Sequence, residues 1–79
     1  MLYDTQRIDD AVLALLAAFC DDTGRSWKGH DWDVMNRLHA EGWISDPISR
    51  AKSVCLTGEG RARGERLAEA LFGSSPPHT

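Results

Sequence analysis

The stretch from residue 31 to residue 60 constrains the fold of this 79-residue chain most strongly. A helical pattern starts at Asp31, whose carboxylate can cap the free amides of a first turn, and ends at Gly42, a residue suited to a left-handed stop. Two short apolar segments follow, at 43–45 and 53–56, with turn-forming residues between them. This order predicts a short helix followed by two strands that double back on each other.

Helical patterns also flank this stretch on both sides. Before it, apolar residues recur at steps of three and four from Ile8 to Phe19, which predicts one buried stripe along a helix that stops at residues 21–24. After it, Thr57 can cap a last helix that Gly73 closes. The segment between the first two helices, which contains Trp27, is expected to be a loop.

The first helix is apolar on the side opposite its predicted stripe as well. The residues on that side are Leu13, Ala14, Ala17 and Ala18. A helix that is apolar most of the way round is covered on two sides, so we expect a second copy of the chain to cover this one. Gly60 and Gly64 in the last helix would let another backbone approach closely, and the same alanines are the expected neighbour.

Length and hydropathy predict a single small domain over residues 1–73, followed by a disordered tail at 74–79. A chain of this size buries only roughly 60–65% of its unfolded surface, so a lone copy is marginally stable and oligomerisation is a common remedy. The longest apolar run, 11–20, is half of the ~20 residues that a bilayer requires. We therefore expect no contact with a membrane and a cytoplasmic location.

Charge is distributed unevenly along the chain, whose net charge is −3. Residues 1–46 carry nine acidic and four basic side chains, whereas residues 47–79 carry three acidic and five basic ones. If the second helix and the following hairpin contacted DNA, the contact candidates would be Asn36, Arg37, Arg50, Lys52, Arg61 and Arg63. Asp33 and Glu41 beside them would repel phosphate, so a solvated face of mixed charge is the preferred interpretation.

Three tryptophans, Trp27, Trp32 and Trp43, flank or lie within the second helical segment. They are interpreted as one aromatic mini-core, slightly ahead of the alternative of an exposed hot spot for a partner. The cysteines and histidines have no spacing typical of a metal site, and no nucleophile is paired with a base. We expect no metal, no cofactor and no enzymatic activity.

Two resemblances bear on the fold. The runs LHAEGWIS and SVCLTGEGRARGERLAEALF resemble the last part of bacterial winged-helix regulators, although only a loop stands where such a module has its middle helix. Over Ile8 to Gly73, the runs IDDAVLALL and SDPISRAKSVCLT are similar to a small bacterial family of uncharacterised domains. That family is catalogued as a domain of unknown function, so the similarity implies an architecture and no activity.

Together these patterns predict a mainly helical α+β fold, a truncated winged-helix-like domain in the order helix, loop, helix, two-stranded wing, helix. The expected function is protein–protein contact, either self-association as a homodimer or binding of a regulatory protein partner. The alternative is a DNA-binding transcriptional regulator that uses the second helix and the wing.

Overall fold

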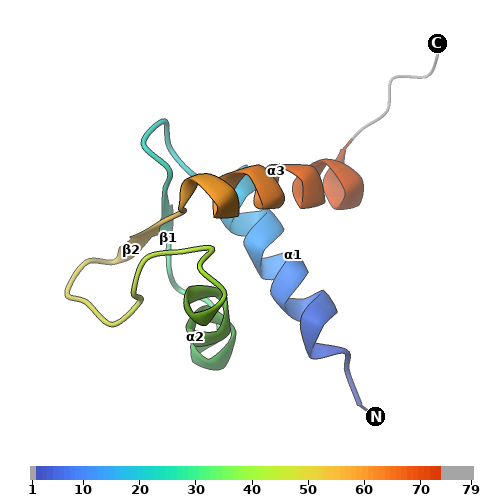
Figure 1. The fold of residues 1–79 in the computed structure, drawn as a ribbon, viewed down its shortest axis with the longest axis horizontal. Coiled ribbons are helices and arrows are strands. Elements are labelled where there is room, and N and C mark those ends of the chain that lie inside the picture. Colours follow the sequence, from blue (N-terminus) through green and yellow to red (C-terminus); the bar gives the residue numbers. More distant parts are fainter. Residues whose placement is uncertain (1, 74–79) are drawn as a thin grey trace.

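The computed structural model describes residues 2–73, which form three helices and a two-stranded antiparallel sheet (Figure 1). The elements, in chain order, are α1 (Thr5–Ala18), β1 (Arg25–Trp27), α2 (Trp32–Ala40), β2 (Ser53–Cys55) and α3 (Gly58–Phe72). The expected α+β, mainly helical fold is confirmed, and the turn-back of residues 43–56 is consistent with a wing-like hairpin. The predicted tail at 74–79 lies outside the described residues.

Each helix begins at a side-chain oxygen that accepts hydrogen bonds from the first turn. Asp4 Oδ1 accepts from the amide of Gln6 at 3.0 Å, and Asp31 Oδ2 accepts from the amide of Val34 at 3.2 Å. Thr57 Oγ1 accepts from the amide of Gly60 at 2.9 Å. These oxygens satisfy amides that have no partner inside the helix, which fixes where each helix starts.

The predicted stop of α2 is confirmed. Gly42 has a φ of +83°, in the left-handed region that glycine adopts without strain. The amide of Trp43 donates to the carbonyl of Leu38 at 3.0 Å, which closes the helix and turns the chain back over the core. The first helix instead ends at Ala18, before the predicted stop, and Gly24 (φ +85°) lies in the tight turn that leads into β1.

The strands that form the sheet are not the two that were predicted to form a hairpin. The segment expected to be a loop contains β1, which pairs antiparallel with β2 so that Ser26 lies opposite Val54. The expected strand at 43–45 contributes only an isolated bridge between Ile44 and Leu56. The ladder stops there because the amide of Cys55 donates to the side-chain Oγ of Ser45 at 2.9 Å, a group that a continuing strand would not use.

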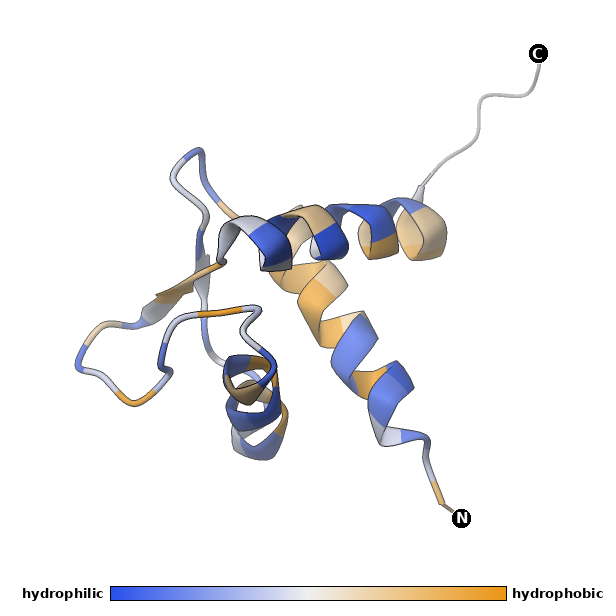
Figure 2. Ribbon diagram, in the orientation of Figure 1, coloured by the Kyte–Doolittle hydropathy of each residue, from blue (hydrophilic) through white to orange (hydrophobic). Residues whose placement is uncertain are grey.

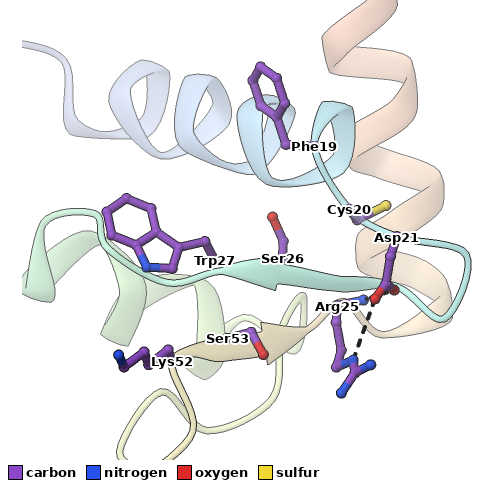
Figure 3. A pocket seen from close by; sticks show the side chains of 8 residues that line it. All are labelled: Phe19, Cys20, Asp21, Arg25, Ser26, Trp27, Lys52 and Ser53. Atoms are coloured by element: carbon purple, nitrogen blue, oxygen red, sulfur yellow. Dashed lines mark hydrogen bonds and ion pairs between the residues drawn. The ribbon is translucent and has the colours of Figure 1, made fainter.

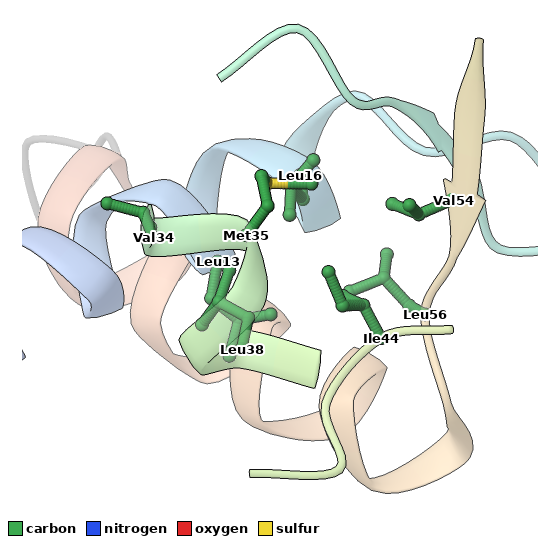
Figure 4. Packing of buried hydrophobic residues seen from close by; sticks show 8 residues of the cluster. All are labelled: Leu13, Leu16, Val34, Met35, Leu38, Ile44, Val54 and Leu56. Atoms are coloured by element: carbon green, nitrogen blue, oxygen red, sulfur yellow. The ribbon is translucent and has the colours of Figure 1, made fainter. Parts of the chain in front are cut away.

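The core lies between α1, α2 and the sheet. Its buried members are Leu13, Leu16, Val34, Met35, Leu38, Ile44, Val54 and Leu56 (Figure 4). On the other side of α1, α3 crosses at close range because Gly64 has no side chain. A Cβ at that position would lie 2.7 Å from the Cβ of Ala17, so the predicted contact with the alanines is confirmed for Gly64. The prediction is wrong for Gly60, whose close neighbour is the backbone of Trp43.

The molecule is a thin slab, 46 × 38 × 19 Å in extent. Figure 1 shows that the N-terminal half of α1 and the C-terminal half of α3 diverge from their crossing point. Neither end is sandwiched between other elements. Apolar side chains near these ends are exposed, such as Ile8 on α1 and Leu71 and Phe72 on α3. Figure 2 shows that hydrophilic positions dominate the N-terminal half of α1 and hydrophobic positions its C-terminal half.

Candidate functional site

The side of α1 that was expected to bind a second copy lies inside the fold. Leu13 and Ala14 have no exposed surface and Ala17 is 8% exposed, whereas Ala18 is exposed. The prediction is therefore wrong for three of its four residues. The reason is that α3 covers this side, and the glycine spacing in α3 was the signal that it would.

The predicted buried stripe of α1 is confirmed only in part. Leu16 is fully buried and Val12 packs half-buried against the core, whereas the side of the helix that contains Ile8 and Phe19 faces solvent. Phe19 is 78% exposed and Ile8 is 38% exposed, while Leu15 between them is half-buried. Tyr3, which precedes the helix, is 73% exposed, and Trp27 on β1 is 66% exposed. We call the surface formed by Tyr3, Ile8, Leu15, Phe19 and Trp27 the α1 face.

One end of the α1 face is hollowed. A depression of about 380 Å³ is lined by Leu15, Phe19, Ser26, Trp27 and His30. The rings of Trp27 and His30 lie 6.4 Å apart at its edge. A second depression, of about 540 Å³, shares Phe19, Ser26 and Trp27 with the first and extends to Arg25 and Lys52 (Figure 3). Together the two depressions have mainly apolar walls and a rim that carries the charged side chains of Asp21, Arg25 and Lys52.

The acidic member of this rim, Asp21, is engaged in the local structure. Its Oδ1 accepts from the hydroxyl of Thr23 at 2.6 Å and from the amides of Thr23 and Arg25 at 2.9 and 3.0 Å. The hydroxyl bond from Thr23, together with these amide bonds, lowers the pKa of Asp21 to about 2. Asp21 is thus an anion at neutral pH, and its hydrogen bonds fix the turn. Lys52 has no acidic partner among residues 2–73.

The leading end of the α1 face has a different character. Leu2 is 99% exposed and projects with Tyr3 beyond the start of the helix. A shallow depression of about 340 Å³ runs from these residues past Asp4 and Arg7 to Ile8 and Ala11. The α1 face therefore has projecting apolar side chains at one end and an apolar hollow at the other.

Three of the six DNA-contact candidates make ion pairs within the protein. Arg37 donates from Nε and Nη2 to the two carboxylate oxygens of Asp9, each at 2.8 Å, and the hydrogen bond to Asp9 raises the pKa of Arg37. Arg63 pairs with Asp10 at 3.1 Å and Arg61 with Glu65 at 3.3 Å. Reading DNA with Arg37 would require breaking a two-point contact to a buried carboxylate.

The other three candidates are exposed. Asn36, Arg50 and Lys52 have no side-chain hydrogen bond within the part of the chain that the structure describes. The loop that carries Arg50 is held by Lys28, whose Nζ donates to the carbonyls of Pro47 and Ser49 at 2.6 and 2.9 Å. The structure thus keeps the basic tip of this loop close to the sheet.

The tryptophans do not form the predicted mini-core. Trp27 and Trp32 are 66% and 50% exposed, and Trp27 pairs with His30. Trp43 is half-buried, and the guanidinium of Arg63 lies 5.3 Å from the centre of its ring. The prediction failed because the three indoles lie on different segments, with Trp27 beside His30, Trp43 beside Arg63 and Trp32 half-exposed.

Among residues 2–73, no group of three or more His, Cys, Asp or Glu side chains is arranged to hold a metal ion. No helix in this described part of the chain is long and apolar enough to cross a membrane.

Comparison with known proteins gives a family. The chain is 47% identical to the uncharacterised protein y4hR of Sinorhizobium fredii over 72 residues, which make up 91% of this chain and 97% of that protein. No solved structure matches the chain. A family model, the domain of unknown function DUF6429, matches residues 4–74. The chain therefore belongs to the DUF6429 family of domains of unknown function.

Proposed function

We propose that this protein works by protein–protein contact and that the α1 face is its contact surface. The observation that carries the proposal is the exposure of three aromatic residues, Tyr3, Phe19 and Trp27, each about two-thirds or more exposed. Tyr3 lies beside Ile8 at the start of α1, and Phe19 and Trp27 line one depression with Leu15. A buried aromatic side chain contributes about 150–250 Å² of contact area. Exposed apolar patches beyond a few hundred Å² typically mark interaction sites.

The chemistry of the surface supports contact over catalysis. Its depressions are lined mainly by apolar side chains, and Asp21, the carboxylate at its rim, already accepts hydrogen bonds from Thr23 and Arg25. Tryptophan and tyrosine are the residues that most often dominate binding energy at protein interfaces. A rim of Arg25 and Lys52 around an apolar centre matches the usual arrangement of such interfaces.

Site-specific photo-crosslinking in cells of the source organism tests the proposal. A benzophenone side chain at position 19 should give discrete polypeptide adducts on irradiation, because the position points into the contact. The same group at position 66, an exposed position on α3, is the matched control and should give none. The proposal fails if positions 19 and 27 both give no adduct while the protein is expressed and folded.

DNA binding remains the second candidate, supported by the wing-like hairpin and by exposed Arg50 and Lys52 in its loop. Phosphate contacts are strongest at low salt, so a duplex library at low ionic strength should then retain the protein. The paired variant Arg50→Ala/Lys52→Ala should lose that retention. Absence of any retention at low salt would exclude this candidate.

A further inference from the structure

We infer that the occupant of the α1 face is a second copy of the same chain, with the two α1 helices antiparallel across a two-fold axis. This inference rests on the proposed function and names its partner. The feature that leads to it is the difference between the two ends of the face. Leu2 and Tyr3 project at the leading end, and Phe19 and Trp27 wall a hollow at the trailing end.

The two ends are complementary in shape and lie on one helix. A helix of 14 residues is about 21 Å long. A two-fold axis that crosses the face midway, near Ala11 and Leu15, carries the projecting end of each copy toward the hollow of the other. Such an isologous contact uses the same patch twice and closes at two subunits.

Charge favours the antiparallel sense. At the leading end, Asp4 uses Oδ1 to cap α1, and its Oδ2 has no partner among residues 2–73. At the trailing end, Lys52 is equally without an acidic partner there. Antiparallel pairing brings this acid and this base together at both ends. In a parallel pair, Lys52 of one chain would lie near Lys52 of the other. The hollow of each chain would then face the hollow of the other, with no side chain to fill it.

The exposed area is also sufficient. At their exposed fractions in the structure, Tyr3, Phe19 and Trp27 offer together roughly 350–500 Å² per chain. Leu2 and Ile8 extend the same face and bring its apolar area toward the ~800 Å² per partner of a standard stable interface. A slab only 19 Å thick also has little capacity to cover these side chains with its own residues.

Sedimentation equilibrium of the purified full chain tests the occupant. The wild type should show a concentration-dependent mass that reaches two chains. Phe19→Glu should raise the dissociation constant by roughly 30-fold or more, since it places a charge in the apolar hollow that receives the projecting end of the other copy. Leu71→Glu is the matched control, because Leu71 is 53% exposed on α3, away from the α1 face, and should leave the constant unchanged.

Cysteine crosslinking tests the arrangement. In a Cys20→Ser/Cys55→Ser background, Ala11→Cys lies near the proposed axis and should form a disulfide-linked dimer under mild oxidation. Ala70→Cys, an exposed position on α3, should not crosslink at a comparable rate. Tyr3→Glu, which lies before α1, serves as a second interface variant if Phe19→Glu loses its helical circular dichroism.

The outcomes separate this inference from the proposed function. A dimer that Phe19→Glu weakens and Ala11→Cys traps supports it. If the chain stays monomeric and position 19 crosslinks to a different protein in cells, the inference that a second copy is the occupant is wrong. The proposed function is then retained. A monomer without adducts overturns both. A dimer that neither Phe19→Glu nor Tyr3→Glu weakens, or that Ala11→Cys does not trap, overturns the surface or its arrangement.

Discussion

The carboxylate of Asp21 organises the turn between α1 and β1 although it is exposed to solvent. It accepts hydrogen bonds from the hydroxyl of Thr23 and from the amide of Arg25, so the turn forms around this one side chain. The same residue closes the edge of β1 next to Arg25, since its own amide donates to the carbonyl of Arg25 at 2.9 Å. One backbone carbonyl on the exposed edge of β1 therefore has a hydrogen-bond partner although no further strand pairs with that edge.

Replacing this carboxylate should make the fold less stable and less sensitive to acid. The pKa of Asp21 is lowered from 3.8 to about 2, so its stabilising effect is present above its unfolded pKa and is lost as pH falls from about 4 toward 2. Asp21→Asn should unfold at lower urea than the wild type at pH 7, and the difference should shrink at pH 2.5. Asp22→Asn is the control, and an equal effect there would contradict the assignment.

Local side-chain contacts were the part of the structure that sequence predicted best. The caps at Asp31 and Thr57 and the stop at Gly42 depend on residues three to five positions apart, so their signal is contained in a short window. The ion pair between Asp9 and Arg37 spans 28 positions and has no local signature. Only the folded structure therefore shows that Arg37, a DNA-contact candidate, is already bound to Asp9.

At the scale of elements, the closest packing occurs where α3 begins beside the end of α2. The carbonyl of Trp43 accepts the amide of Thr57 at 3.0 Å and lies directly against Gly60. Thr57 also caps α3 and donates its hydroxyl to the carbonyl of Gly42 at 2.7 Å. The start of α3 is therefore fixed to the end of α2 at several points, which leaves no room for a side chain at position 60.

Gly60→Ala should destabilise the protein even though alanine favours helices. The helix propensity gain is about 1 kcal/mol. A Cβ at position 60 would overlap the backbone of Trp43, which is held in place, and overpacking of this kind typically costs about 1–3 kcal/mol or more. We expect a net loss of about 1–2 kcal/mol in urea unfolding. Gly58→Ala, which meets nothing within 4 Å, should be neutral or stabilising.

The sheet shows why one element escaped prediction from sequence. β1 is three residues long and alternates exposed, buried, exposed, which is too short for a periodic signal. Its partner lies 28 positions away, since Ser26 pairs with Val54. A strand of this kind is defined by the pairing and not by its own residues.

At the scale of the whole molecule, sequence established that α1 is apolar all round but not which side the domain covers. Leu13 and Leu16 on one side and Leu15 and Phe19 on the other are similarly apolar, so hydropathy alone does not distinguish them. The distinction comes from α3, which can approach only the side that presents small residues. Packing of α3 on α1, two elements far apart in sequence, thus determines which side of α1 remains exposed as the candidate site.

If a second copy covers the α1 face, thermal stability should depend on protein concentration. A hundredfold rise in concentration adds up to about 2.7 kcal/mol to the stability of a dimer, which corresponds to several degrees in Tm for a domain of this size. Differential scanning calorimetry from micromolar to millimolar concentration measures the shift. Phe19→Glu should have a Tm that does not change over this range, and a constant Tm in the wild type would contradict dimerisation.

The thinness of the slab has a consequence for divergence within the family. Few side chains lie far from water, so the fold constrains a short set of positions, such as Leu13, Met35 and Ile44. Phe19 and Trp27 are outside that set, because the folded chain gains little from them. If a partner covers the α1 face as proposed, relatives that share this partner should keep large hydrophobic groups at these two positions, whereas folding alone constrains the interior positions.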